Sequence, residues 1–292
     1  FREFIMHKRA LVYVESPYQL INALACLRSI PVADVNIILR DNGNHLQNEQ
    51  FQKIIDAEYM QSMRAYYCPD TSILKFFFVV RLAIILMLKT WSHSIVVTGA
   101  WPSIVVTLAL KWNFWNYKNV YLVDDGLQLL GMLKKIQDYP LMLFSRLPLT
   151  EYLQEVGISK YSIKIQKQSS EKIKAIDYGV CFIGSPIVEL GMLSRDPYCE
   201  VLIKIREKHY SDNFYYFAHR SESKDKLSVI KRLGYTVIIP NLPIEDYLRE
   251  NGGYKGHYYS FYSTALFNLS ETVPSSSFYS IRPSPSTWPQ SD

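Results

Sequence analysis

The fold is decided near the start of the chain, where residues 10–39 read ALVYVESPYQLINALACLRSIPVADVNIIL. Two short apolar runs, Ala10–Val14 and Val35–Leu39, lie on either side of Pro17–Arg28, which we expect to form a helix. A strand, a helix and a second strand in this order form a βαβ unit, and such units build parallel sheets covered by helices. This stretch therefore predicts an α/β fold.

The alternation of strands and helices continues along the chain. We expect helices over 46–56, 73–88 and 103–111 and strands over 95–98 and 120–123. The stretch 159–174 is rich in Ser, Lys and Gln, a composition that cannot build a core. We expect it to connect two domains.

After this polar stretch the alternation starts again. We expect strands over 178–183, 213–218 and 236–239, a helical region that starts over 188–193 and resumes through 198–208, and helices over 226–233, 244–249 and from Ser263 onward. The sequence thus predicts two Rossmann-like domains, 6–158 and 175–283, with the linker 159–174 between them and a disordered Ser/Pro-rich tail, 284–292. Two such domains that face each other across a cleft form the GT-B architecture of many glycosyltransferases.

The composition is that of a folded globular protein, because 48% of the 292 residues are hydrophobic and 20% are charged. The net charge of +5 is modest and the basic residues are spread out, which argues against nucleic-acid binding but allows attraction to anionic lipids or substrates. Four cysteines without CxxC spacing indicate free, buried thiols in a reducing compartment. No signal peptide is visible, so we expect a cytoplasmic protein.

The segment 73–88 is the one stretch that resembles a membrane span. It has 16 residues and includes Lys75 and Arg81, whereas a spanning helix needs roughly 20 apolar residues. We expect a buried or partly interfacial helix, and at most a peripheral association with the inner face of the cytoplasmic membrane. The sequence leaves the oligomeric state open, a homodimer included.

Two adjacent carboxylates, Asp124 and Asp125, followed by Gly126, end the predicted strand 120–123. Open parallel sheets bind ligands at the carboxyl ends of their strands, and glycine lets a ligand approach the backbone closely. Successive side chains of a strand point to opposite faces, so we expect one acid to face the ligand and the other to support it. Acidic residues at such a position also serve as helix N-caps, and this alternative stays open.

Polar side chains also follow the predicted strands of the second domain. His219 and Arg220 come directly after strand 213–218, and imidazole and guanidinium groups are suited to binding anions. Ser263 and Thr264 lie where a helix begins, and hydroxyls together with free backbone amides at such a place form a phosphate site. Ser263 is equally suited to be a plain N-cap.

Two further loops end at the same predicted edge of the sheet. Glu245 opens a short helix after strand 236–239, where a carboxylate either binds ribose hydroxyls or simply favours the helix start. Gly184 and Ser185 follow strand 178–183 and either contact a nucleotide or only turn the chain. Because the chain contains no GxGxxG, GxxxxGK[ST], HExxH or GxSxG sequence, a nucleotide site has to be built from these groups.

In their order along the chain, Asp124-Asp125-Gly126, His219, Glu245 and Ser263-Thr264 resemble the motifs of the bacterial sialyltransferases. The nearest pattern is that of the family 52 lipooligosaccharide sialyltransferases and the bacterial polysialyltransferases. The turn at Val14–Leu20 also looks like their first strand-to-helix turn. This resemblance implies a GT-B fold, a CMP-activated nonulosonic acid as donor, and an inverting reaction that requires no metal or other cofactor.

The resemblance also implies roles for the residues of the second domain. His219 would protonate or hydrogen-bond the departing CMP phosphate, Ser263 and Thr264 would hold this phosphate, and Glu245 would bind the ribose. The acceptor that it implies is a cell-surface glycan or glycolipid, either lipooligosaccharide or capsule polysaccharide.

The resemblance assigns the base that deprotonates the acceptor hydroxyl to one carboxylate of the pair Asp124 and Asp125, with Asp125 preferred and the choice between them open. One departure is Arg220, which stands where the family has a proline after its histidine. Arg220 either binds the carboxylate or phosphate of the donor or faces solvent. Donors such as CMP-linked pseudaminic acid, legionaminic acid or Kdo therefore stay open.

Two other functions stay open at this point. In a metal-dependent UDP-sugar transferase, Asp124 and Asp125 would hold Mg²⁺, although the DDG sequence lacks the DxD spacing. A protein without catalytic activity would instead bind a glycan or a nucleotide and act as a scaffold in a surface-polysaccharide complex.

Overall fold

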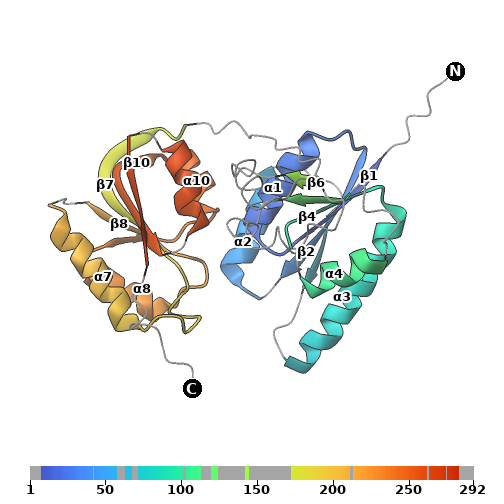
Figure 1. Cartoon of the computed structure of the whole chain (residues 1–292), viewed down its shortest axis with the longest axis horizontal. Helices are drawn as coiled ribbons and strands as arrows, with labels where there is room; N and C mark the ends of the chain where they lie inside the picture. Colours follow the sequence, from blue (N-terminus) through green and yellow to red (C-terminus); the bar gives the residue numbers. More distant parts are fainter. Residues whose placement is uncertain are drawn as a thin grey trace, which may run out of the picture. The chain divides into compact units, whose positions relative to one another are not determined.

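Figure 1 shows a computed structural model of the whole chain. The structure describes residues 8–41, 43–57, 63–67, 72–100, 103–112, 120–123, 142–144, 172–210, 213–261, 263–273 and 275–282. The chain divides into two compact units, Phe1–Gln168 and Ser169–Asp292, and the boundary falls inside the predicted linker 159–174. They are called unit 1 and unit 2 below, and each is described by itself.

Unit 1 is built on a six-stranded parallel sheet with the strand order β3-β2-β1-β4-β5-β6. The strands are β1 (Arg9–Val14), β2 (Asp34–Asp41), β3 (Met63–Tyr67), β4 (Ile95–Thr98), β5 (Val120–Val123) and β6 (Met142–Phe144). This is the Rossmann strand order, which reverses between β1 and β4. In such sheets, ligands bind at the carboxyl ends of the two strands where the order reverses.

Helices cover both faces of this sheet (Figure 1). Helices α1 (Pro17–Arg28) and α2 (His45–Ala57) lie on one face, and α3 (Ser72–Ser92) and α4 (Ile104–Trp112) lie on the other. Helix α1 begins close after β1 because the Ser16 hydroxyl accepts a hydrogen bond from the Gln19 amide and Pro17 favours a first helical position. In the described part of the chain, no helix combines the length and the hydropathy that crossing a membrane requires.

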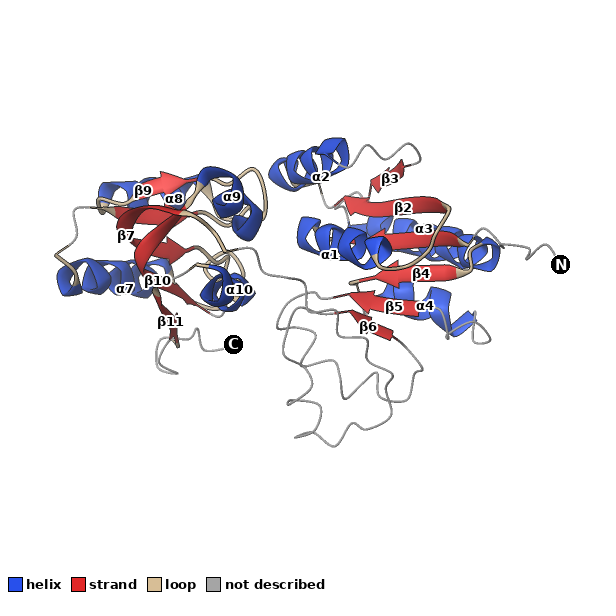
Figure 2. Ribbon diagram, turned by 90° about the horizontal axis from the view of Figure 1, so that it is seen from above, coloured by secondary structure: helices blue, strands red, loops and turns tan. Residues whose placement is uncertain are grey.

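Unit 2 contains a five-stranded parallel sheet with the order β11-β10-β7-β8-β9 (Figure 2). The strands are β7 (Ala175–Ile183), β8 (Phe214–Phe217), β9 (Thr236–Ile238), β10 (Gly253–Phe261) and β11 (Ser277–Ile281). The helices are α7 (Arg195–Lys208), α8 (Lys224–Arg232), α9 (Ile244–Asn251) and α10 (Thr264–Thr272). Its first strand, β7, is again central, and the order reverses between β7 and β10. Unit 2 is therefore also Rossmann-like.

Side chains that alternate along β7 separate two cores in unit 2. Val180 and Phe182 pack in a cluster with residues of α7 and α8, such as Leu202 and Ile230. On the other face, Cys181 and Ile183 pack with residues of α9 and α10, such as Leu248 and Leu266. The sheet is thus buried on both faces, as parallel sheets usually are.

The predicted α/β class with two Rossmann-like units is confirmed, and α1, β4 and β5 have the predicted bounds. Strands β3, β6, β10 and β11 were not predicted. The nine residues of β10 include two glycines, Lys255 and His257, which interrupt the apolar pattern. Strand β6 has only three residues, and β11 includes two serines.

The prediction of helix over 188–193 is wrong. The segment forms turns, in which the Leu190 amide donates to the Pro186 carbonyl and the Met192 amide donates to the Ile187 carbonyl. Gly191 has a positive φ of 69°, which ends any right-handed helix at this position. Helix α7 begins only at Arg195.

The structure describes three of the four cysteines. Cys26 and Cys181 are free and buried as predicted, and burial raises the pKa of the Cys26 thiol to about 12. Cys199 is free but only half-buried. Cys68 lies outside the described residues.

Candidate functional site

Three predicted site segments follow adjacent strands of unit 2. Gly184 and Ser185 come after β7, His219 comes after β8, and Ser263 comes after β10, in a sheet where β10, β7 and β8 are neighbours. Because neighbouring strands lie about 4.8 Å apart, the carboxyl ends of β10 and β8 are roughly 10 Å from each other. The strand order reverses at this edge, between β7 and β10, which is the usual ligand site of such sheets.

His219 lies in a loop that fixes the orientation of its ring. The Ser221 amide donates to Nδ1 over 3.2 Å, so the proton of the neutral ring is on Nε2. Burial, with smaller contributions from the nearby cations Arg220 and Lys226, lowers the pKa of His219 to about 4. At neutral pH the ring is therefore uncharged, and its Nε2–H is a hydrogen-bond donor.

A buried charge network holds the loop of His219. One oxygen of Glu222 accepts from the His219 amide at 2.7 Å, and the other accepts from the Tyr216 hydroxyl at 2.6 Å. The Lys226 ammonium lies 2.6 Å from Glu222 Oε1 and donates to the Ser185 carbonyl over 3.0 Å. The side chains of Lys226 and Glu222 are 1% and 0% exposed. The network thus connects the loop after β7 with the loop after β8.

Two tyrosines and a second carboxylate extend this network. The hydroxyls of Tyr198 and Tyr216 are 2.6 Å apart, and Lys226 Nζ lies 3.9 Å from the ring centre of Tyr198. Glu189 accepts from the Ser223 amide over 2.9 Å, and its other oxygen lies 3.4 Å from Lys226 Nζ. The Lys226 ammonium thus contacts two carboxylates, a backbone carbonyl and an aromatic ring, all of unit 2. Its charge is therefore compensated within this unit.

Sequence reasoning missed this network. Glu222 and Lys226 are spaced i and i+4 around the N-cap Ser223, which is also the pattern of an ordinary exposed ion pair at a helix start. Lysine is among the residues least often buried, so nothing in the local pattern separates the two cases. One signal for the network was present in the sequence of strand β8, which is entirely aromatic. The hydroxyl of a buried tyrosine such as Tyr216 needs a hydrogen-bond partner, which predicts buried polar groups nearby.

Gly184 is required by the same network. A Cβ at this position would collide with the Glu222 carboxylate and would lie 2.9 Å from both the Phe217 carbonyl and the Tyr216 hydroxyl. The Gly184 amide donates to the Phe217 carbonyl over 2.8 Å. Gly184 therefore lets the end of β7 pack tightly against β8, and any direct contact with a nucleotide stays a prediction.

Ser263 and Thr264 occupy the start of α10. Ser263 is the N-cap residue, but its hydroxyl makes no capping hydrogen bond. The first amides of α10 and the positive end of the helix dipole lie here, directly after β10. A hydroxyl and amides in this arrangement can hold a phosphate group.

Glu245 lies in the first turn of α9 and is only 5% exposed. Its Oε1 accepts a hydrogen bond of 2.7 Å from the Asn268 amide group on α10. This contact links the two helices on one face of the sheet, which is a structural role. The predicted ribose contact of Glu245 stays a prediction.

A pocket of about 430 Å³ opens next to the buried network, where α7 and α8 begin. Its lining includes Ser194, Arg195 and Asp196 of the first turn of α7 and Ser223 and Asp225 at the start of α8. Lysine and arginine alternate here with aspartate, so the pocket is polar and carries both signs of charge. It lies at the same carboxyl edge of the sheet, because both helices start there.

The predicted site residues of unit 1 lie outside the described residues: the catalytic pair Asp124 and Asp125, and Gly126, which was predicted to contact the ligand. Strand β5, which precedes them, is described and is the neighbour of β4 in the sheet. In the described ranges, no three His, Cys, Asp or Glu side chains converge on a site for a metal ion.

Glu15 is a polar residue of unit 1 that was not predicted to belong to a site. It follows β1, next to the reversal between β1 and β4, and it accepts hydrogen bonds from Tyr13 at 2.7 Å and Ser103 at 2.8 Å. Arg40 at the end of β2 lies 2.9 Å from its other oxygen. The backbone carbonyl of Glu15 accepts from Gln47 over 3.1 Å. The carboxyl edge of unit 1 therefore carries an ion pair.

Comparisons with known proteins add little to this geometry. No protein-family model and no curated protein matches the chain. Among solved structures, it is similar to a putative UDP-N-acetylglucosamine 2-epimerase from Listeria monocytogenes, with a TM-score of 0.49, 10% identity, and coverage of 91% of this chain and 78% of that one. It is also similar to MurG from Acinetobacter baumannii, with a TM-score of 0.34, 9% identity, and coverage of 88% and 74%. The strand orders, rather than these similarities, establish the two Rossmann-like units.

Proposed function

We propose that this protein is a glycosyltransferase that binds the phosphate of a nucleotide-activated sugar at the carboxyl edge of unit 2. The observation that carries the proposal is the placement of two uncharged donors, His219 Nε2–H and the Ser263 hydroxyl, after the strands on either side of β7. The first amides of α10 add further donors. Together they suit a phosphate near the reversal of the strand order.

The chemistry of sugar transfer uses such donors. When the bond between sugar and nucleotide breaks, negative charge grows on the departing phosphate, and donors already in place stabilise that charge. Because the pKa of His219 is lowered to about 4, this ring acts in the proposal as a neutral hydrogen-bond donor. A bound phosphate would raise this pKa, so proton transfer would become possible only with the ligand present.

The donor that we propose is a CMP-activated nonulosonic acid, and the acceptor is a lipooligosaccharide or capsule glycan. Support comes from the ordered set of residues that resembles the bacterial sialyltransferases. In this proposal Asp125, with Asp124 and Gly126 beside it, removes the proton from the acceptor hydroxyl, and the reaction inverts the anomeric centre without a metal. Arg220 binds the carboxylate of the donor.

A metal-dependent UDP-sugar transferase is the second candidate. The specific observation in its favour is Arg220, which replaces the family's proline and supplies a cation that would suit the additional charge of a diphosphate. In this case Asp124 and Asp125 would hold the metal ion.

A thermal-shift series with CMP, UMP, UDP, GDP and ADP in EDTA tests the donor. Ligand stabilisation follows RT ln(1 + [L]/Kd), so we expect a shift with CMP that exceeds the others. His219→Ala should reduce the shift, and His209→Ala is the matched control, because His209 follows the C-terminal end of α7 at the opposite edge of the sheet.

Each other outcome rejects part of the proposal. A shift with UDP only after Mg²⁺ is added would replace the CMP donor by the second candidate. If no nucleotide gave a shift, the phosphate site itself would be rejected. If CMP bound but no CMP-sugar was turned over with any glycan acceptor, a binding protein without catalytic activity would remain.

A further inference from the structure

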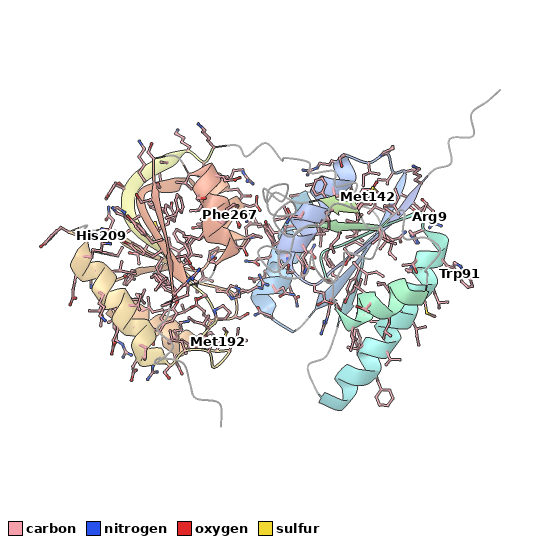
Figure 3. All side chains as sticks on the ribbon, in the orientation of Figure 1. Arg9, Trp91, Met142, Met192, His209 and Phe267 are labelled. Atoms are coloured by element: carbon pink, nitrogen blue, oxygen red, sulfur yellow. The ribbon has the colours of Figure 1, made fainter. Side chains whose placement is uncertain are left out.

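Helices α3 and α4 of unit 1 present an apolar surface to solvent. Its exposed residues are Phe77, Val80, Ile84, Leu88 and Trp91 on α3 and Ile104 and Leu108 on α4. The two helices lie side by side on one face of the sheet, and Figure 3 shows Trp91 at the outer side of α3. These seven residues are called the α3–α4 patch. Exposed apolar patches of this kind usually mark an interaction surface.

The five patch residues of α3 form one continuous stripe. At 3.6 residues per turn they fall within about 80° of the helix circumference, and the stripe from Phe77 to Trp91 is roughly 21 Å long. Trp91 is 74% exposed and Phe77 is 67% exposed, so both ends of the stripe are open to solvent. A stripe of this length is more than the scattered exposed apolar residues of an ordinary surface.

The opposite side of α3 is fixed in the core of unit 1. Leu82 and Leu86 lie about half a turn from the centre of the stripe and are buried. Helix α3 therefore cannot leave the unit without exposing this side. A partner has to meet the patch from outside, with α3 lying flat against it.

The charges of the two helices are all of one sign. Helix α3 contains Lys75, Arg81 and Lys89, α4 contains Lys111, and neither helix contains Asp or Glu. Arg81 is exposed and lies next to the stripe, where its long side chain can carry the guanidinium past the apolar residues. Among the side chains that the structure describes, the patch thus combines exposed apolar residues with the cation Arg81 at its border, and neither helix contributes an acid.

We propose that the α3–α4 patch binds the surface of an anionic lipid bilayer. Helices with an apolar face and only basic charges lie in the plane of such surfaces, with apolar residues in the acyl boundary and cations among the lipid headgroups. Trp91 would lie at the interface, where tryptophan is enriched in membrane-associated proteins. The flat orientation of α3 fits this position.

A second copy of the chain fits the patch less well. A twofold interface would bring α3 and α4 against the same helices of the partner, so Arg81 would enter the interface without a compensating acid from either helix. An anionic bilayer supplies both the apolar environment and the opposite charge. This inference is independent of the proposed function, since it uses no residue of the phosphate site.

Co-sedimentation of the whole chain with vesicles tests the proposal. We expect binding to vesicles of phosphatidylcholine mixed with phosphatidylglycerol, and weak binding to phosphatidylcholine alone. Leu88→Ser combined with Trp91→Ser should lower the partition coefficient at least about tenfold, because two large apolar side chains no longer enter the lipid.

The matched control lies in unit 2, where Leu190 and Tyr210 are a leucine and an aromatic residue that are more exposed, at 66% and 104%, than Leu88 and Trp91, at 58% and 74%. The double change Leu190→Ser and Tyr210→Ser should leave vesicle binding unchanged. Circular dichroism of both double variants verifies that they are folded. Arg81→Glu should weaken binding to anionic vesicles and leave the weak binding to phosphatidylcholine unchanged.

Three outcomes would overturn the proposal. The first is no binding of the wild type to anionic vesicles. The second is an equal loss of binding in both double variants. The third is a dimer in analytical ultracentrifugation that Leu88→Ser with Trp91→Ser dissociates while vesicle binding is absent, which would assign the patch to a second copy of the chain.

Discussion

The two units share a strand order but differ in the charges at the edge where that order reverses. In unit 1, the ion pair of Glu15 and Arg40 stays partly accessible, with 23% of each side chain exposed. In unit 2, Lys226 and Glu222 are buried, Glu222 holds the loop of the neutral His219 ring, and Ser263 follows β10 on the other side of β7. An accessible carboxylate repels a phosphate, whereas neutral donors attract one. For the proposed phosphate site, the burial and pairing of Glu222 therefore matter, because they keep this carboxylate away from a bound anion.

The largest effect is expected from removing the buried cation of unit 2. Lys226→Met leaves the buried Glu222 carboxylate without its cation. Burial already raises the pKa of this carboxyl, and breaking a buried ion pair costs about 3–5 kcal/mol. In unit 1, Arg40→Met breaks a partly exposed pair and should cost about 1 kcal/mol or less. Urea unfolding of both variants measures the difference.

Two probes separate the units in this experiment. Four of the five tryptophans belong to unit 1, so their fluorescence follows mainly that unit, whereas far-UV circular dichroism follows both. Adding Glu222→Gln to Lys226→Met should restore part of the lost stability, because it removes the uncompensated charge. Equal losses for Lys226→Met and Arg40→Met would show that the two ion pairs do not differ as described.

A smaller difference is expected between two glycines at the same edges of their sheets. In Gly184→Ala the new methyl group meets Glu222 and backbone of β8, and such overpacking costs about 1–3 kcal/mol. In Gly99→Ala, after β4 of unit 1, the three nearest atoms to the methyl group all belong to the Gln19 side chain, and no backbone atom or buried charge is among them. Urea midpoints should therefore fall more for Gly184→Ala, and the reverse order would contradict the packing at the end of β7.

The two helix-start serines should separate stability from binding. Ser16 accepts a capping hydrogen bond, so Ser16→Ala should cost about 1 kcal/mol of stability. Ser263 makes no such bond, so Ser263→Ala should leave stability nearly unchanged and should weaken nucleotide binding, as measured by calorimetry. A stability loss at Ser263 with unchanged nucleotide binding would make it an ordinary cap.

The smallest effect, when measured near neutral pH, is expected in the pH dependence of stability. The pKa of His219 is lowered from 6.5 to about 4, so below pH 6.5 the unfolded chain binds a proton that the folded ring does not. The stability contributed by this group is present above pH 6.5 and is lost as the pH falls toward 4, by about 0.7 kcal/mol between pH 7 and pH 6 and by about 3 kcal/mol in full. His219→Gln should flatten this part of the profile, while His45→Gln on the exposed side of α2 should not.

Much of the fold could be predicted from the sequence because the central strands are short apolar runs between helices. Strands β4 and β5 and helix α1 follow this pattern and have the predicted bounds. Strand β10 could not be predicted, since its place in the middle of the sheet is decided by pairing with β7 rather than by its own glycine-rich sequence. Its glycines are tolerated there because neighbouring backbone approaches closely, as at Gly256.

Half of the candidate site could be predicted and half could not. His219 and Ser263 were predicted because each directly follows a strand or starts a helix, and this local rule needs no tertiary information. Lys226 and Glu222 could not be predicted, because their burial results from how α8 packs on the sheet. The contact of Glu245 with Asn268 has the same origin, since it joins two helices that are separated in the sequence.

The buried network also has a consequence for the order of folding. Its members, from Ser185 to Lys226, all belong to the continuous segment β7-α7-β8-α8. Contacts between residues close in sequence cost less chain entropy to form, so this segment can assemble early. Strand β10 and the start of α10 are synthesised later and would then dock against a β7 whose loop is already fixed. The two halves of the proposed phosphate site would thus be completed at different times, the half with His219 before the half with Ser263.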